Sequence, residues 1–222
     1  MIKNKIISLT YKTILLTISF LAMYHMFLNI TPNTLAYFTN LSNILVFIVF
    51  LIIWIRTFKD VALNKKIDGA NQHLVRAKGI ATVSIAITGL IYSTMLAKYN
   101  QISNYTVQNL SVHYIIPILT VLDYFLFDQK GLIKWYHPLI WALIIVLYLP
   151  YIFIRALILG ENTELIKYPY FFLNIDNIGV LNVVLWCIGI AALFIFISYL
   201  IYIYDRWQNK SWTVLLVQLL FF

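Results

Sequence analysis

Residues 44–55 read ILVFIVFLIIWI, an uninterrupted run of apolar side chains. A helix needs about 20 predominantly apolar residues to cross the hydrocarbon core of a bilayer, and this run is the centre of such a stretch. Five similar stretches follow or precede it along the chain, separated by short polar segments. The predicted spans are 6–30, 37–58, 77–98, 109–128, 137–159 and 178–204. The sequence therefore predicts an all-α, polytopic membrane protein with six transmembrane helices.

The composition agrees with this class of protein. Of the 222 residues, 62% are hydrophobic and only 11% are charged, and the mean hydropathy is +0.86, which excludes an ordinary soluble domain. No connection between the predicted spans is long enough for a soluble domain. We therefore expect one six-helix domain at 1–206, followed by a tail at 207–222 whose apolar part is too short to cross the membrane.

The positive charge is distributed unevenly between the two sides of the predicted bundle. Thirteen of the 16 Lys and Arg residues flank the chain ends and the loops on one side, and only Lys98, Arg155 and Lys167 fall on the other. Positively charged loops remain in the cytoplasm. This pattern predicts that both termini are cytoplasmic, and it explains the net charge of +8 without a nucleic-acid partner. The abundance of Ile, Lys and Asn is typical of an AT-rich genome and favours a bacterial cell membrane.

Several chemistries have no support in the sequence. The only cysteine, Cys187, lies within a predicted span, so no intramolecular disulfide is possible and no cysteine-based metal motif is present. The chain also lacks the HExxH, P-loop, dinucleotide and Gly-x-Ser-x-Gly motifs. We expect no metal and no cofactor.

Polar side chains inside the spans are costly in hydrocarbon and mark the candidate site. Thr39 and Asn43, at the start of the second span, are four residues apart and share one helix face. Such groups commonly join packed helices by hydrogen bonds, which is the structural alternative to a catalytic role.

His113, in the fourth span, lies four residues before Pro117, whose ring is expected to kink the helix there. The second and fourth spans both run inward from the outer face, and Thr39 and His113 lie at similar depths in them. The two side chains can therefore meet if their helices are neighbours. His25, near the end of the first span, is a second candidate.

Two of the charged residues within the predicted spans, Arg155 and Asp123, lie where they could bear on this site. Arg155 needs a partner, for which Asp176, Glu161 and a ligand carboxylate are the candidates. Asp123 lies ten residues beyond His113, about 15 Å deeper at 1.5 Å per residue. It is interpreted as a structural group bonded to Tyr92 or Asn182 rather than as a partner of His113.

Several motifs, taken in order, resemble those of a known family. The chain is similar to bacterial six-helix relatives of the androgen-induced membrane hydrolases. The matching segments are Tyr37–Asn43, Thr88–Tyr92, His113–Pro117, Leu122–Phe127, Tyr151–Arg155 and Tyr168–Phe172. They cover the second to sixth spans, which is more specific than any one motif alone.

This resemblance implies a catalytic pair. In the animal relatives an intramembrane threonine is the nucleophile and a histidine is the base, and they hydrolyse fatty acid esters of hydroxy fatty acids. Thr39 and His113 match those positions. Substrate contacts are assigned to Asn43, Arg155, Tyr92 and Ser93. Ser93 departs from the bacterial branch, which often has a histidine there.

The leading hypothesis is an integral membrane hydrolase of long-chain acyl esters. A neutral imidazole near pH 7 can accept the proton of a threonine hydroxyl, which is otherwise a poor nucleophile. The alternatives are a non-catalytic protein that binds or transports lipid or fatty acid, and a purely structural membrane partner. The expected ligand in the first two cases is a membrane-embedded acyl lipid.

Overall fold

A computed structural model describes residues 1–97, 106–160 and 165–209 of the chain. It is 80% helical, with no strand in the described part, and six of its helical segments are long and apolar enough to cross a membrane. The helices are α1 (Lys5–Leu28), α2 (Pro32–Ala36), α3 (Phe38–Ala62), α4 (Val75–Ile91), α5 (Val107–Leu110), α6 (Ile116–Phe127), α7 (His137–Leu159) and α8 (Ile175–Gln208). The predicted all-α, six-span fold is confirmed. The apolar part of the tail lies outside the described residues.

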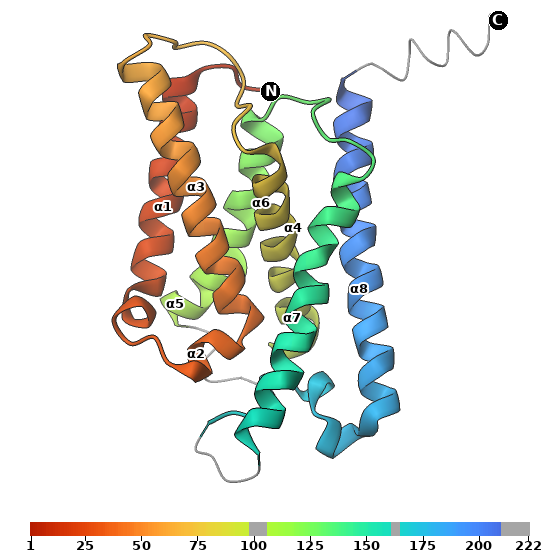
Figure 1. Cartoon of the computed structure of the whole chain (residues 1–222). Helices are drawn as coiled ribbons and strands as arrows, with labels where there is room; N and C mark the ends of the chain where they lie inside the picture. Colours follow the sequence, from red (N-terminus) through yellow and green to blue (C-terminus); the bar gives the residue numbers. More distant parts are fainter. Residues whose placement is uncertain (98–105, 161–164, 210–222) are drawn as a thin grey trace, which may run out of the picture.

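The long helices form one bundle whose two ends differ (Figure 1). The start of α1 and the end of α8 lie at the same end, and the short helices α2 and α5 lie at the other. The first is called the basic end here, because it carries Lys3, Lys5 and the 59–76 loop. The second is called the outer end, after the predicted orientation. The orientation itself stays a prediction from charge.

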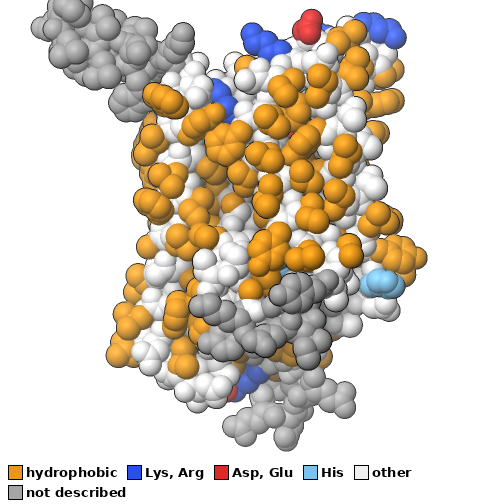
Figure 2. Space-filling view, turned by 180° about the vertical axis from the view of Figure 1, so that it is seen from behind, with side chains coloured by type: hydrophobic (Ala, Val, Ile, Leu, Met, Phe, Trp, Pro, Cys, Tyr) orange, Lys and Arg blue, Asp and Glu red, His pale blue; other side chains and the backbone are white. Residues whose placement is uncertain are grey.

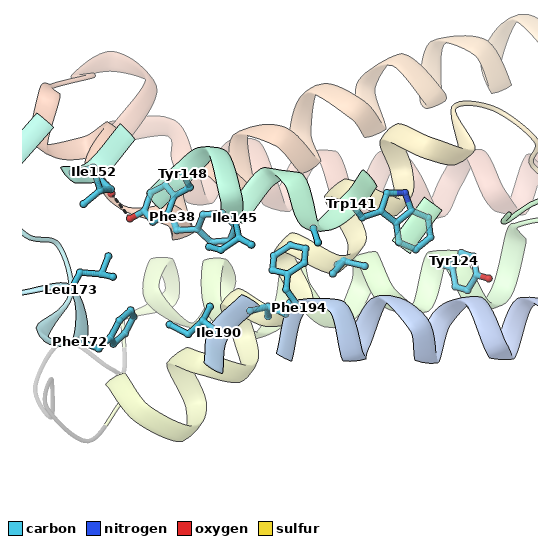
Figure 3. Close-up of a cluster of buried hydrophobic side chains, with 14 of the residues drawn as sticks. Phe38, Tyr124, Trp141, Ile145, Tyr148, Ile152, Phe172, Leu173, Ile190 and Phe194 are labelled. Carbon is cyan, nitrogen blue, oxygen red and sulfur yellow. Dashed lines mark hydrogen bonds between the residues drawn. The ribbon is translucent and has the colours of Figure 1, made fainter. Parts of the chain in front are cut away.

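Helix α4 is the centre of the packing. It contacts α3 and α6 on one side and α7 and α8 on the other. One apolar cluster fills the space between α1, α3, α4 and α6. A second, rich in aromatic rings, joins α7 and α8 to the rest of the bundle (Figure 3). The fold thus buries two apolar cores against a single central helix.

Apolar side chains also cover the outside of the bundle. Figure 2 shows them over the full length of the helices, with charged side chains gathered at the ends. Leu157 and Leu181, for example, are 82% and 72% exposed. A surface of this kind is stable in hydrocarbon and unstable in water. The architecture is that of a multi-pass membrane protein.

Two of the spanning segments contain a π-helical turn near the outer end. Tyr92–Leu96 continues α4, and Ser111–Ile115 joins α5 to α6. In the second, the Ile116 amide donates to the Ser111 carbonyl, five residues back. Pro117 has no amide hydrogen to continue the regular ladder. The expected irregularity before Pro117 is therefore present, as a widened turn that contains His113.

A buried ionic cluster joins three helices near the basic end. The Lys12 ammonium contacts Asp123 Oδ1 at 2.8 Å, and the Lys78 ammonium contacts Asp123 Oδ2 and Asp128 Oδ1. The interpretation of Asp123 as a partner of Tyr92 or Asn182 is wrong. The reason is that Lys12 and Lys78, counted above as flanking charges, point into the bundle. Lys12 and Asp123 are fully buried, and charges can be buried in this way only when they are paired.

Candidate functional site

The outer end of α3 is held in place by side chains from neighbouring segments. The short helix α2 ends at Ala36, Tyr37 is extended, and α3 begins at Phe38. The Tyr148 hydroxyl donates to the Ala36 carbonyl at 2.8 Å (Figure 3), and the Asn40 amide donates to the Thr34 carbonyl at 2.8 Å. These bonds fix the turn between α2 and α3, and so they fix Thr39 in the first turn of α3.

Thr39 lies in a small aromatic pocket. Its backbone amide donates to the Tyr170 hydroxyl at 3.3 Å. The cavity beside it, lined in part by Thr88, Tyr148 and Phe172, has a volume of about 40 Å³. This volume accommodates a few water molecules but not a fatty acyl chain.

Tyr170 was not predicted as a site residue. It belongs to the loop before α8, where its ring stacks on Phe172 with centroids 5.1 Å apart, and no amphipathic or spacing signal in the sequence indicates that this loop returns to α3. Its phenol takes the place of an N-cap, because the N-cap residue Tyr37 makes no side-chain capping bond. Burial raises the pKa of Tyr170, so the phenol stays protonated at neutral pH and can donate a hydrogen bond.

Removing this phenol oxygen tests whether it supports the start of α3. A Tyr170→Phe variant is expected to lower the free energy of unfolding by about 1 kcal/mol, the usual net contribution of such a hydrogen bond. Tyr168→Phe is the matched control: the Tyr168 ring contacts the Lys167 ammonium, which Phe retains, and its hydroxyl has no hydrogen bond within the described part of the chain. Reversible unfolding in detergent measures both. Equal losses in the two variants would contradict the capping role.

A layer of polar groups links α3 to α4 and to the turn that carries His113. The Ser42 hydroxyl lies 2.9 Å from the Thr88 hydroxyl. The Asn43 amide donates to the carbonyls of Thr39 at 2.8 Å and Val112 at 3.2 Å. Both hydrogens of the Asn43 amide are thereby used. Asn43 is therefore a connector between helices in this structure, as in the structural alternative considered above, and has no hydrogen left for a substrate.

His113 lies in the π-helical turn, 9% exposed. Its ring stacks on Tyr92, with centroids 3.5 Å apart and 10° between the planes. The Tyr92 hydroxyl donates to Asn109 Oδ1 at 2.7 Å, which fixes the tyrosine. His113 Nδ1 is buried and has no hydrogen-bond partner in the described part of the chain. An imidazole nitrogen in this position is available to a proton or to a ligand.

The structure brings most of the predicted residues into one region. Thr39 and His113 lie on neighbouring segments that Asn43 joins, and Tyr92 packs against His113. Thr39 lines the aromatic cavity, whereas His113 and Ser93 line a separate groove. No described hydrogen bond joins the Thr39 and His113 side chains. His25 is exposed on α1, with its ring against Tyr24.

Arg155 has other partners than those expected. Its guanidinium donates to the Ile166 and Lys167 carbonyls and to Asn33 Oδ1, the last at 3.1 Å. Asp176 pairs instead with the Lys167 ammonium at 2.7 Å, so the expected Arg155–Asp176 pair is wrong. The segment after residue 164 folds over the end of α7 and brings its carbonyls to the guanidinium. Glu161, the other protein candidate, lies outside the described residues.

The chain matches no protein-family model, and searches of curated proteins and of solved structures return no match. The fold and the polar layer define the class of protein: a six-helix membrane protein with a buried Thr, Asn, Tyr and His layer at one end of its bundle.

Proposed function

We propose that this protein is an integral membrane hydrolase of long-chain acyl esters, with Thr39 as the nucleophile and His113 as the base. One observation carries the proposal. A threonine hydroxyl and an imidazole whose Nδ1 has no hydrogen-bond partner among the described residues belong to the same buried layer, on segments that the bond from Asn43 to the Val112 carbonyl joins. Polar groups inside a membrane span are costly unless they have a structural or a chemical role. The ring of His113 packs on Tyr92, but its Nδ1 makes no hydrogen bond to a described residue that would give this nitrogen a structural role.

The chemistry follows from these two groups. His113 accepts the Thr39 proton as the hydroxyl oxygen attacks the ester carbonyl, and the imidazolium then protonates the departing alcohol. Water, activated by the same imidazole, hydrolyses the acyl-threonine and releases the fatty acid. Because the two side chains are not hydrogen-bonded in the free protein, the reaction requires them to approach when substrate binds, as catalytic contacts often tighten only in the complex.

The oxyanion of this reaction needs donors. Asn43, a predicted substrate contact, cannot be this donor, because its amide hydrogens already bind two carbonyls. The protonated phenol of Tyr170 lies at the first turn of α3, where the positive end of the helix dipole favours negative charge. We assign the oxyanion to this phenol.

One observation favours a second function, the binding or transport of a fatty acid without hydrolysis. Thr39 and His113 line different cavities. An imidazole at the end of an apolar groove can hold a carboxyl or ester group without any help from Thr39.

Turnover by matched variants distinguishes the two functions. Wild type, Thr39→Ala, His113→Ala and Thr57→Ala are compared on a panel of long-chain acyl esters in detergent or nanodiscs. Thr57 is the control, because it is a buried threonine at the opposite end of the same helix and bonds only its own backbone, at Ile53. We expect turnover in wild type and Thr57→Ala, and its loss to the background rate in the other two.

The other outcomes of this experiment are also informative. Turnover that survives in Thr39→Ala would remove Thr39 from the mechanism. Saturable binding of a fatty acid by wild type, with no hydrolysis of any ester and no covalent labelling of Thr39 by a fluorophosphonate, would establish the second function instead.

A further inference from the structure

An apolar groove runs along the surface between α4 and α6. Its volume is about 390 Å³, and its two walls are formed by residues between Ala86 and Ser93 on one side and between His113 and Leu122 on the other. The residues at its rim are partly exposed; Ile118, for example, is 55% exposed. The groove lies within two spanning segments, so its open side faces the lipid.

Small residues on α4 and on the π-helical turn that continues it line one wall of this groove. Ala86, Gly89 and Ser93 are three and four residues apart and therefore share one face of the helix. A Cβ atom on Gly89 would lie 2.9 Å from the His113 carbonyl oxygen and 3.1 Å from Pro117 Cβ. The two segments thus approach closely at Gly89, and the groove is the hollow that the short side chains leave beside this contact.

The polar side chains that line the groove lie toward one end of it. His113 and Ser93 are at the outer end, and the Ser93 hydroxyl already donates to the Leu90 carbonyl at 3.0 Å. His113 is more than nine-tenths buried, its ring stacks on Tyr92, and its enclosed Nδ1 bonds no described residue. An apolar groove that has an imidazole at one end is complementary to a molecule with an apolar tail and a polar head.

The direction of the groove matches that of a lipid in the bilayer. It follows the helices from His113 toward Leu122, nine residues or about 13 Å at 1.5 Å per residue. His113 is six residues, about 9 Å, from the start of its span at Val107. The span Val107–Phe127 has 21 residues, which is about 31 Å at 1.5 Å per residue and close to the hydrocarbon thickness of about 30 Å. The imidazole therefore lies in the outer part of the hydrocarbon, and the rest of the groove lies deeper, at the depth of the acyl chains.

We propose that this groove binds one acyl chain of a membrane lipid ester, parallel to α4 and α6, with the ester group at His113. The substrate then enters sideways from the bilayer and does not need an opening to water. This proposal takes its ligand class from the proposed function, but binding in the groove does not require Thr39 or turnover.

Photo-crosslinking in nanodiscs tests the groove. The probe is a palmitoyl ester with a diazirine in its chain and an alkyne for recovery, and the protein is Thr39→Ala so that hydrolysis cannot remove the probe. We expect the crosslinked peptides to concentrate at 86–93 and 113–122. Ala86→Phe and Val121→Phe, which fill the groove from its two walls, should each reduce these crosslinks at least fivefold. Leu185→Phe is the control, because Leu185 is 58% exposed on α8.

The outcomes separate this proposal from the proposed hydrolase. Crosslinks spread over all lipid-facing helices, or unchanged in both groove variants that remain folded by size-exclusion chromatography, would overturn the groove even if wild type hydrolyses esters. Crosslinks confined to the groove with no turnover by wild type would retain the groove and reject the hydrolase. Crosslinking in Leu185→Phe that falls as much as in Ala86→Phe would also count against the groove.

Discussion

An Asp123→Asn variant is expected to lose about 3–5 kcal/mol of unfolding free energy, the usual cost of removing one partner from a buried ion pair. Asparagine keeps the size of the side chain but removes the charge that Lys12 and Lys78 share. Only Asp128 then remains against two ammonium groups. Lys12 and Asp123 are both 0% exposed, so neither charge can be rehydrated without opening the bundle. Reversible unfolding in detergent gives the difference from wild type.

Two comparisons make this result specific to the ionic cluster. Asp176→Asn breaks the exposed pair with Lys167 and should cost less than about 1 kcal/mol, as surface pairs do. The double variant Lys12→Met with Asp123→Asn removes one charge of each sign. It should be more stable than the sum of the two single changes predicts, by about 0.5–3 kcal/mol. A loss in Asp123→Asn no greater than that in Asp176→Asn would show that the cluster is hydrated.

The spans could be predicted closely because the physical signal for them is local. The second span was expected at 37–58 and the helix is Phe38–Ala62, and the fifth was expected at 137–159 and is His137–Leu159. A long apolar segment has few alternatives to a helix in hydrocarbon. The sixth span was expected at 178–204. Gly179 has a non-helical φ of 76°, which separates a first turn at Ile175 from the continuous helix, so that helix begins next to the expected start.

The partners of charged residues could not be predicted, because they depend on packing. Lys12 was counted with the charges that flank the first span, although it lies seven residues inside α1. That position is the one signal that it must turn inward to a counter-ion. Arg155 needed a partner in any interpretation, but carbonyl groups of a folded-back segment could not be foreseen from sequence. The partners of Lys12 and Arg155 both depend on which helices and loops are neighbours in the folded protein.

The candidate site was predictable in part. Asn43, at the start of the second span, hydrogen-bonds the Val112 carbonyl before Pro117, as polar groups on adjacent membrane helices commonly do. A shared site of Thr39 and His113 stays a prediction. The division of the polar layer between a cavity at Thr39 and a groove at His113 was not predictable. It depends on where Tyr170 and Tyr92 lie, and both positions are set by tertiary contacts.

A Gly79→Ala variant is expected to destabilise the protein by about 2 kcal/mol. A Cβ atom there would lie 2.1 Å from Trp141 Cζ2 and 2.2 Å from Cε2, far inside the normal carbon contact of about 3.5–4.0 Å. Trp141 is fully buried and cannot swing away. Overpacking of this kind costs about 1–3 kcal/mol, occasionally more. Alanine regains up to about 1 kcal/mol of helix propensity, so a strain of about 3 kcal/mol exceeds the gain.

Gly189→Ala is the matched control for this prediction, because it is the same change inside α8 with no atom within 4 Å of the new Cβ. The change there affects only the helix propensity, so Gly189→Ala should raise the free energy of unfolding by up to about 1 kcal/mol. The two variants should therefore change the free energy of unfolding in opposite directions. Gly79→Ala should also lose less stability in a Trp141→Leu background than in the wild type, since the smaller side chain leaves room for the new methyl group. Stabilisation by Gly79→Ala in the wild-type background would mean that α4 and α7 are farther apart in the membrane than this packing requires.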